Sequence, residues 1–181
     1  EWIAAGRVEV NGVVITSAVG LIAGDISING YQIGAAATDG VSNNTATTSG
    51  IAVAAAINAI SGNSNVSATV SATAVAGTTV TTFTAMAAGD ILINGVDIGA
   101  IATATTAAGR GGQVAAAINA KTAQTGVTAT VNTSTGAVAL AAADGRNIDV
   151  TTKATSLAIN TGLGSGGVAT TVTRSLVTLT S

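Results

Sequence analysis

The chain has 181 residues, of which 48% are hydrophobic but only 2% aromatic, and its formal net charge is −2. It contains neither cysteine nor histidine, which excludes disulfides, thiolate metal sites and the commonest general base of enzymes. The six lysines and arginines form no cluster, so we expect no nucleic-acid binding. Polar residues and glycines interrupt every apolar run well short of a bilayer-spanning length, so we expect no membrane insertion.

Asparagine–glycine pairs recur along the chain and predict three β-hairpins. The first lies in Arg7–Ser17, where two β-prone runs flank Asn11 and Gly12. An Asn-Gly pair favours the type I′ turn of a two-residue hairpin because both residues must adopt positive φ. The residues that we assign to structural turns are Asn11, Gly12, Asn29, Gly30, Asn94, Gly95, Asp144 and Gly145.

One stretch of the chain is nearly repeated. Gly24–Gly34 reads GDISINGYQIG and Gly89–Gly99 reads GDILINGVDIG. Each is followed by an alanine-rich segment that ends in AAAIN, and then by a Thr/Val-rich segment with strand character, at 66–71 and 127–132. A hairpin, a helix and a strand repeated in one order indicate a duplicated structural module.

Local signals place a helix in each module. In the first, Ser49 is a suitable N-cap for a helix over about 51–60, with Gly62 as its stop. In the second, we expect the helix to follow Gly111-Gly112, so that Arg110 and the two glycines open it. The sequence thus predicts a β-rich α+β fold of two tandem modules, each a small antiparallel sheet covered by one short helix.

The expected organisation has four parts: an N-terminal hairpin at 1–21, modules at 22–87 and 88–151, and C-terminal strands at 152–181. Further strands are expected at Thr79–Phe83 and Ala137–Leu140, and around Ile148 and Val150. The last two β-prone pieces, Val168–Thr173 and Leu176–Leu179, are expected to pair with the N-terminal hairpin. That pairing would bring both chain ends to one side.

The two modules differ in the loop between hairpin and helix. Gly24 and Gly89 are 65 positions apart, whereas Ala54 and Ala115 are 61 apart, so the first loop is longer by four residues. An insertion at this place disturbs no strand ladder. We interpret the difference as loop variation on a fixed scaffold.

No group of residues indicates catalysis or a cofactor. Asp25 and Asp90 repeat at matching places before strands, which favours a turn or strand-start role over a catalytic pair. Arg110 at a helix start could attract an anion, but the phosphate-binding motifs are missing. Asp90 and Asp97 lack the ligand spacing of a calcium loop. We therefore expect no catalytic, cofactor or metal site, and we expect that the protein is not an enzyme.

The repeated pieces resemble a known family. The order of GD-I-x-ING-x-x-IG, AAAIN-A, GVTATV and AADGRNI, the last at Ala142–Ile148, is similar to the flagellin hook IN motif of bacterial flagellins and hook-associated proteins. The second copy matches throughout. The first copy matches through Gly24–Gly34, Ala54–Ala59 and Val66–Val70, without a clear AADGRNI equivalent.

The resemblance implies the variable outer domain of a flagellin, extracellular on the bacterial flagellum and contributing to the filament exterior in motility. The implied partners are other copies of the same subunit in a helical filament, the flagellar export machinery with its chaperone, and O-linked glycans. The long heptad-patterned helices that build a flagellin core are missing from this sequence. A filament cap or hook-associated protein therefore stays open as an alternative.

A cell-surface adhesin or carbohydrate-binding repeat is a further alternative. Such a module would present an exposed aromatic platform. The aromatic residues here are Trp2, Tyr31 and Phe83, and they are scattered along the sequence. The triplets that begin at Asn43, Asn65 and Asn132 fit the N-glycosylation pattern, but chance explains them in a chain this rich in Asn, Ser and Thr.

Overall fold

The computed structural model describes residues 10–12, 20–153, 158–164 and 170–181. The strands are β1 (Val10–Gly12), β2 (Ile26–Ile28), β3 (Tyr31–Gln32), β4 (Ser67–Val70), β5 (Thr73–Val75), β6 (Ile91–Ile93), β7 (Val96–Asp97), β8 (Thr128–Val131), β9 (Val138–Ala142), β10 (Ile148–Thr152), β11 (Thr171–Thr173) and β12 (Val177–Thr180). The helices are η1 (Ala46–Thr48), α1 (Gly50–Asn58), α2 (Ser61–Ser64), α3 (Ala107–Asn119), α4 (Thr122–Thr125) and α5 (Ala158–Thr161). This is a mixed α+β fold of small antiparallel sheets and few helices, as the sequence predicts.

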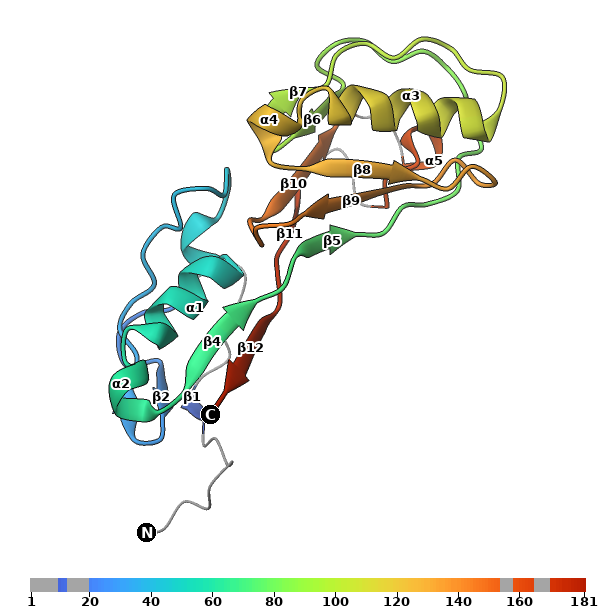
Figure 1. Ribbon diagram of the computed structural model, residues 1–181. Helices are drawn as coiled ribbons and strands as arrows, with labels where there is room; N and C mark the ends of the chain where they lie inside the picture. Colours follow the sequence, from blue (N-terminus) through green and yellow to red (C-terminus); the bar gives the residue numbers. More distant parts are fainter. Residues whose placement is uncertain (1–9, 13–19, 154–157, 165–169) are drawn as a thin grey trace.

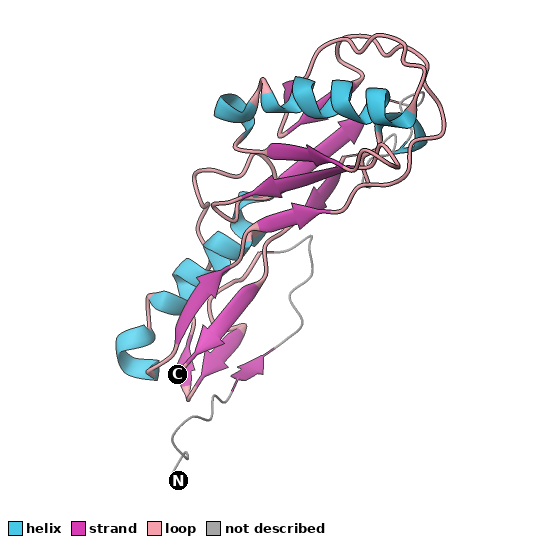
Figure 2. Ribbon diagram, turned by 45° about the vertical axis from the view of Figure 1, so that its right-hand side comes forward, coloured by secondary structure: helices cyan, strands magenta, loops and turns pink. Residues whose placement is uncertain are grey.

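Two units with separate hydrophobic cores lie end to end (Figure 1). The first unit comprises residues 20–70 with strands β1 and β12, and its core surrounds Ile28, Ile57 and Val66. The second unit comprises the described part of residues 73–173, and its larger core surrounds Ile93, Ile118 and Leu140. Strand β1 and the C-terminal end of β12 lie at the end of the elongated molecule that is remote from the second unit (Figures 1 and 2).

The sheets of the two units correspond strand by strand. In the second unit β10 pairs with β6, Val150 opposite Ile93, and β8 pairs with β9, Val131 opposite Val138. In the first unit β1 takes the place of β10 beside β2, and β12 takes the place of β9 beside β4. The first unit is therefore completed by strands from both ends of the chain.

The second unit is inserted into the first. The chain leaves the first unit between β4 and β5 and returns between β11 and β12, and β5 joins the sheet β5-β9-β8 of the second unit. The expected division at residue 87 does not follow the sheets, because β5 lies before it in sequence but pairs with β9. At the crossing, the backbone N–H of Ser71 donates to the Leu176 carbonyl (3.0 Å).

The turn expected at Asn11-Gly12 is wrong. Both residues lie in β1, where they pair with Ser27 and Ile26 of β2. The preference of Asn-Gly for a tight turn is local, and pairing with the exposed edge of β2 overrides it. The flanking parts of the expected hairpin lie outside the described residues.

The expected pairing of the C-terminal strands with the N-terminal hairpin is also wrong for the described residues. β11 pairs with β10 and β12 pairs with β4. Pattern and turn chemistry define each strand but not its partner, and β12 pairs with a strand that lies far away in sequence, Val177 opposite Val70.

Three local expectations need correction. Helix α3 begins at Ala107 with Thr106 as its N-cap, so Arg110, Gly111 and Gly112 lie inside it and do not open it. Residues 79–83 form no strand; the strand of that region is β5, at Thr73–Val75. In the first helix the Ser49 cap is confirmed, since its side chain accepts a hydrogen bond from the Ala52 N–H. The expected stop at Gly62 is wrong, because α1 ends at Asn58 and Gly62 lies within α2.

A candidate functional site at the joint between the two units

The asparagines of the repeated motif bind backbone within each unit. At the end of helix α3, the Asn119 side chain donates to the Ala129 carbonyl (2.9 Å) and accepts from the Ala129 N–H (2.8 Å). At the end of α1, Asn58 makes the same two bonds to Ala68, at 2.9 and 2.7 Å. In each unit this asparagine fixes the helix to the strand that follows it.

The turn residues also make matching contacts. Asn29 and Gly30 have φ of 50° and 84°, and Asn94 and Gly95 have φ of 48° and 77°, as a type I′ turn requires. The side chain of Asn29 donates to the Ser64 carbonyl, and that of Asn94 to the Thr125 carbonyl, both at 2.8 Å. These asparagines therefore join each hairpin to the short helix below it.

The repeated aspartates have turn roles as well. Asp25 accepts from the Ile22 N–H at 3.0 Å, and Asp90 accepts from the Ala87 N–H at 2.8 Å. Each carboxylate closes the tight turn that leads into its hairpin. The geometry therefore gives both residues a structural task at the strand start.

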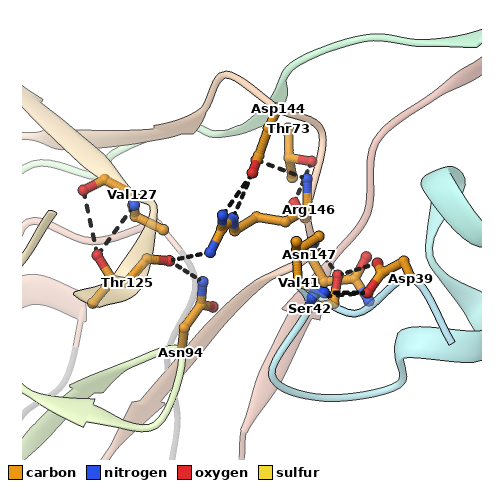
Figure 3. A network of polar contacts seen from close by, with 10 residues as sticks. All are labelled: Asp39, Val41, Ser42, Thr73, Asn94, Thr125, Val127, Asp144, Arg146 and Asn147. Carbon is orange, nitrogen blue, oxygen red and sulfur yellow. Dashed lines mark hydrogen bonds and ion pairs between the residues drawn. The ribbon is translucent and has the colours of Figure 1, made fainter. Parts of the chain in front are cut away.

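A polar joint connects the two units (Figure 3). It consists of the loop 39–48 of the first unit, the segment 144–149 of the second, and the crossing segments around Ser71 and Arg174. The Asn147 backbone N–H donates to the Ser42 hydroxyl (2.9 Å), and its side chain donates to the carbonyls of Asn44 (3.0 Å) and Thr45 (3.3 Å). The loop that is longer by four residues in the first unit is thus the one that reaches the second.

The loop also contacts the hairpin turn of the second unit. The Asn43 side chain donates to Asp149 Oδ2 (3.0 Å), and its amide lies so close to Gly95 that a Cβ there would be 3.2 Å away. Gly95 therefore serves twice: its positive φ makes the turn, and its missing side chain admits the loop. The corresponding Gly30 has no atom within 4 Å of a Cβ position.

Arginines support the joint from both sides. Arg146 binds Asp144 through Nε (2.8 Å) and Nη2 (2.7 Å), and its guanidinium covers Gly126. On the other side, Arg174 donates to the carbonyl and the hydroxyl of Thr48, both at 3.1 Å. Gly145, with φ of 80°, packs against Ser71 and Val70 at the crossing. Asp144 and Gly145, predicted as turn residues, are therefore part of the joint.

Comparison with known proteins gives a match to the second copy of the repeated motif. Residues 90–144 match the family described as the flagellin hook IN motif. This segment carries a flagellin-related motif. The matched segment extends from Asp90, before β6, to Asp144 at the joint, and so covers the hairpin, α3, β8 and β9. A search of curated proteins gave no match.

The matched family is structural and flagellar. The part of the chain that the structure describes holds no group of three or more acidic residues that could bind a metal ion. No helix in that part is long and apolar enough to cross a bilayer. The buried Arg110 donates to the carbonyls of Ala102 and Thr84, so its charge is turned inward and not toward an anion at the helix start.

The pKa values of the joint carboxylates are shifted in opposite directions. The hydrogen bond from Arg146 lowers the pKa of Asp144. For Asp39, burial acts to raise the pKa, but hydrogen bonds from the Ser42 hydroxyl and from backbone N–H groups outweigh it and lower the pKa. Burial raises the pKa of Asp149, with partial opposition from Asn43 and Arg174. Asp149 is thus the one carboxylate of the joint whose ionisation is disfavoured by its surroundings.

Sequence reasoning missed the joint. It treated Asn147 as a turn residue, placed Asp149 in a strand around Ile148 and Val150, and treated the stretch that contains Ser42–Thr45 as a loop. The signal that could have found them is the four-residue difference in loop length together with the polar Asn-Ile-Asp alternation, which gives β10 one polar face.

Proposed function

We propose that this chain is the surface-exposed outer domain of a bacterial flagellar filament subunit, a flagellin, and contributes to the filament exterior in motility. The observation that carries the proposal is the motif match at residues 90–144 in an elongated molecule. β1 and the C-terminal end of β12 lie at the same end, and the second unit forms the opposite tip. An outer domain that grows out of an inner one needs both connections at one end.

The proposal includes two copies of the motif. Its support is the set of identical contacts in the first unit: Asn58 with Ala68, Asn29 with Ser64, and Asp25 with Ile22. The first copy is harder to recognise from sequence because the strands equivalent to β9 and β10 come from the chain ends.

The partners that we propose are other copies of the subunit in a helical filament, and the export machinery with its chaperone. A chain without cysteine or proline needs neither disulfide formation nor proline isomerisation when it refolds after export. Exposed Ser and Thr side chains, such as Thr133 and Ser134, would be available to O-linked glycans in the extracellular space.

Labelling of intact filaments tests the proposal. The chain contains no cysteine, so Thr133→Cys in the parent subunit gives this chain a single thiol, on an exposed turn of the second unit. A membrane-impermeant fluorescent maleimide should then label filaments along their whole length. The matched control, Val114→Cys, is fully buried and should stay unlabelled.

Two other outcomes of the labelling would contradict the proposal. Fluorescence confined to the filament tip or to the hook junction would support the cap or hook-associated alternative. Labelling of the cell surface without filaments, together with glycan binding by the isolated chain, would support an adhesin.

A further inference from the structure

Asp149 has an unusual environment for a carboxylate. It lies on β10 at the joint and is 2% exposed. Its Oδ2 accepts one hydrogen bond, from Asn43 at 3.0 Å, and its Oδ1 has no hydrogen-bond partner. A buried carboxylate normally accepts several hydrogen bonds or forms an ion pair, because ionisation in a low dielectric is costly.

A second orphaned acceptor lies next to it. Asn147 immediately precedes β10 and lies two residues before Asp149, and both side chains face the loop of the first unit, Asp149 through Asn43 and Asn147 through Asn44 and Thr45. Asn147 is 1% exposed, and its Oδ1 also lacks a partner. Both buried oxygens are hydrogen-bond acceptors, and neither has a donor. This part of the joint therefore lacks a hydrogen-bond donor.

The charged groups around the joint do not supply that hydrogen. Arg146 is paired with Asp144 at 2.7 Å. Arg174 acts on Asp149 through its charge, while its guanidinium donates to Thr45 and Thr48. Asp39 is a further negative charge on the facing loop, and its carboxylate accepts a hydrogen bond from the Ser42 hydroxyl. Asp149 itself forms no ion pair with any described residue.

We propose that Asp149 takes up a proton from solvent as the joint closes, so that the two units are held more tightly in mild acid than in neutral or alkaline solution. The proton on Oδ1 converts an acceptor into a donor and supplies the hydrogen that the Asn147–Asp149 face lacks. Loss of that proton places an incompletely solvated charge under the loop 42–45, and the loop separates from β10 to admit water. The joint is thus a pH-dependent contact between the first unit and the second unit.

The direction of the effect follows from linkage. The pKa of Asp149 is higher in the folded than in the unfolded chain, so the folded state binds the proton more tightly. Ionisation of Asp149 therefore lowers stability as pH rises from its unfolded pKa through its folded pKa. Asp97 and Asp144 have lowered pKa values and act in the opposite direction.

The test compares the wild-type chain with Asp149→Asn, which keeps the shape and carries a permanent donor. Because the chain has no cysteine, Asn63→Cys in the first unit and Gln124→Cys in the second allow spin labels on exposed positions. In the wild type, the distance distribution between the labels should be narrow near pH 4.5 and broad near pH 8. In Asp149→Asn it should be narrow at both values.

Thermal unfolding gives an independent readout. The melting temperature of Asp149→Asn should exceed that of the wild type at pH 8, by about 2–4 °C for each kcal/mol regained, and the difference should vanish in mild acid. The matched control is Asp97→Asn, which lies outside the joint and should leave the wild-type pH dependence of the label distances unchanged.

Three results would overturn the proposal. The first is a wild-type distance distribution that does not change with pH, a measurement that needs no Asp149 variant to fold. The second is a pH dependence that persists in Asp149→Asn. The third is a distribution that responds to calcium chloride or to a chelator at constant pH, since a bound cation, and not a proton, would then neutralise Asp149.

Discussion

The two units use the same internal contacts but differ in what surrounds them. Both fix helix to strand through an asparagine, Asn58 or Asn119, and both close the hairpin onto the next helix through Asn29 or Asn94. The difference lies in the loop before the helix, which in the first unit is longer and bridges to the second. Motif residues therefore preserve each unit, whereas the variable loop determines how the units are joined.

The helices illustrate the same contrast. α3 is continuous over 13 residues, whereas in the first unit the 3-10 turn η1 precedes α1, which has 9 residues. In both, a glycine lets the helix touch the opposing segment: Gly111 against Gly136, and Gly50 against Ser175. The partner is backbone in one case and chiefly a side chain in the other, and this difference can be tested.

The largest effect is expected for Gly111→Ala. Its new methyl group would collide with the Gly136 carbonyl, which cannot move without distorting the entry to β9. We expect a loss of about 3 kcal/mol in the free energy of unfolding, measured by urea denaturation. In Gly50→Ala the methyl group would meet mainly the Ser175 hydroxyl, which has no hydrogen-bond partner and is able to rotate, so the loss should be about 1 kcal/mol. Equal losses would contradict the contrast between backbone and side-chain partners.

Asn119→Ala and Asn58→Ala come next and should agree with each other. Each substitution removes two hydrogen bonds and leaves a backbone N–H and carbonyl unpaired, at a cost of about 2 kcal/mol. Asn119→Asp is the matched control, since it keeps the acceptor and should lose about half as much. If only one of the two alanine variants destabilises its unit, the equivalence of the units is wrong.

Asn147→Ala should affect the joint and leave both cores intact. It removes the side-chain bonds to Asn44 and Thr45 at a cost of about 1.5 kcal/mol. The distance between labels on the two units should broaden, while amide exchange within α1 and α3 stays slow. Thr133→Ala, on an exposed turn of the second unit, is the control and should change neither quantity. Fast exchange in either helix would mean that the joint is part of a core.

The smallest effect is expected for Asp144→Asn. The pair with Arg146 is partly exposed, with side-chain exposures of 45% and 22%, so its loss should cost less than about 1 kcal/mol at neutral pH. Because the pKa of Asp144 is lowered, its contribution is present above the unfolded pKa and is lost as pH falls through the folded pKa. The wild-type and variant melting temperatures should therefore converge in acid, and a difference that grows in acid would contradict this assignment.

The sequence was sufficient for the parts that local chemistry decides. The positive φ values at Asn29-Gly30 and Asn94-Gly95, and the Ser49 cap of α1, follow from turn and capping preferences alone. The isoleucines of β2 and β6 lie in or against the two cores, as the two-residue side-chain period of a strand allows. Fold class and family were therefore within reach of the sequence.

The parts that were out of reach depend on long-range pairing. The Asn11-Gly12 pair has the composition of a turn but lies in β1, because the edge of β2 is available to it. Nothing local indicates that β12 completes the first unit or that β5 joins the second. The joint could not be predicted either, since the partners of Asn147 are about a hundred residues away in sequence.

The central claim, that a second copy of one unit is inserted into the first, has a direct test. In the second unit, residues 132–137 connect β8 to β9. When residues 73–173 are replaced by a single serine, β4 and β12 are also joined by six residues. These are residues 71 and 72, the new serine, and residues 174–176. This shortened chain and the isolated segment 73–173 should each give a dispersed amide NMR spectrum and a cooperative unfolding transition. A shortened chain that stays unfolded while segment 73–173 folds would contradict the claim that the first unit is complete without the second.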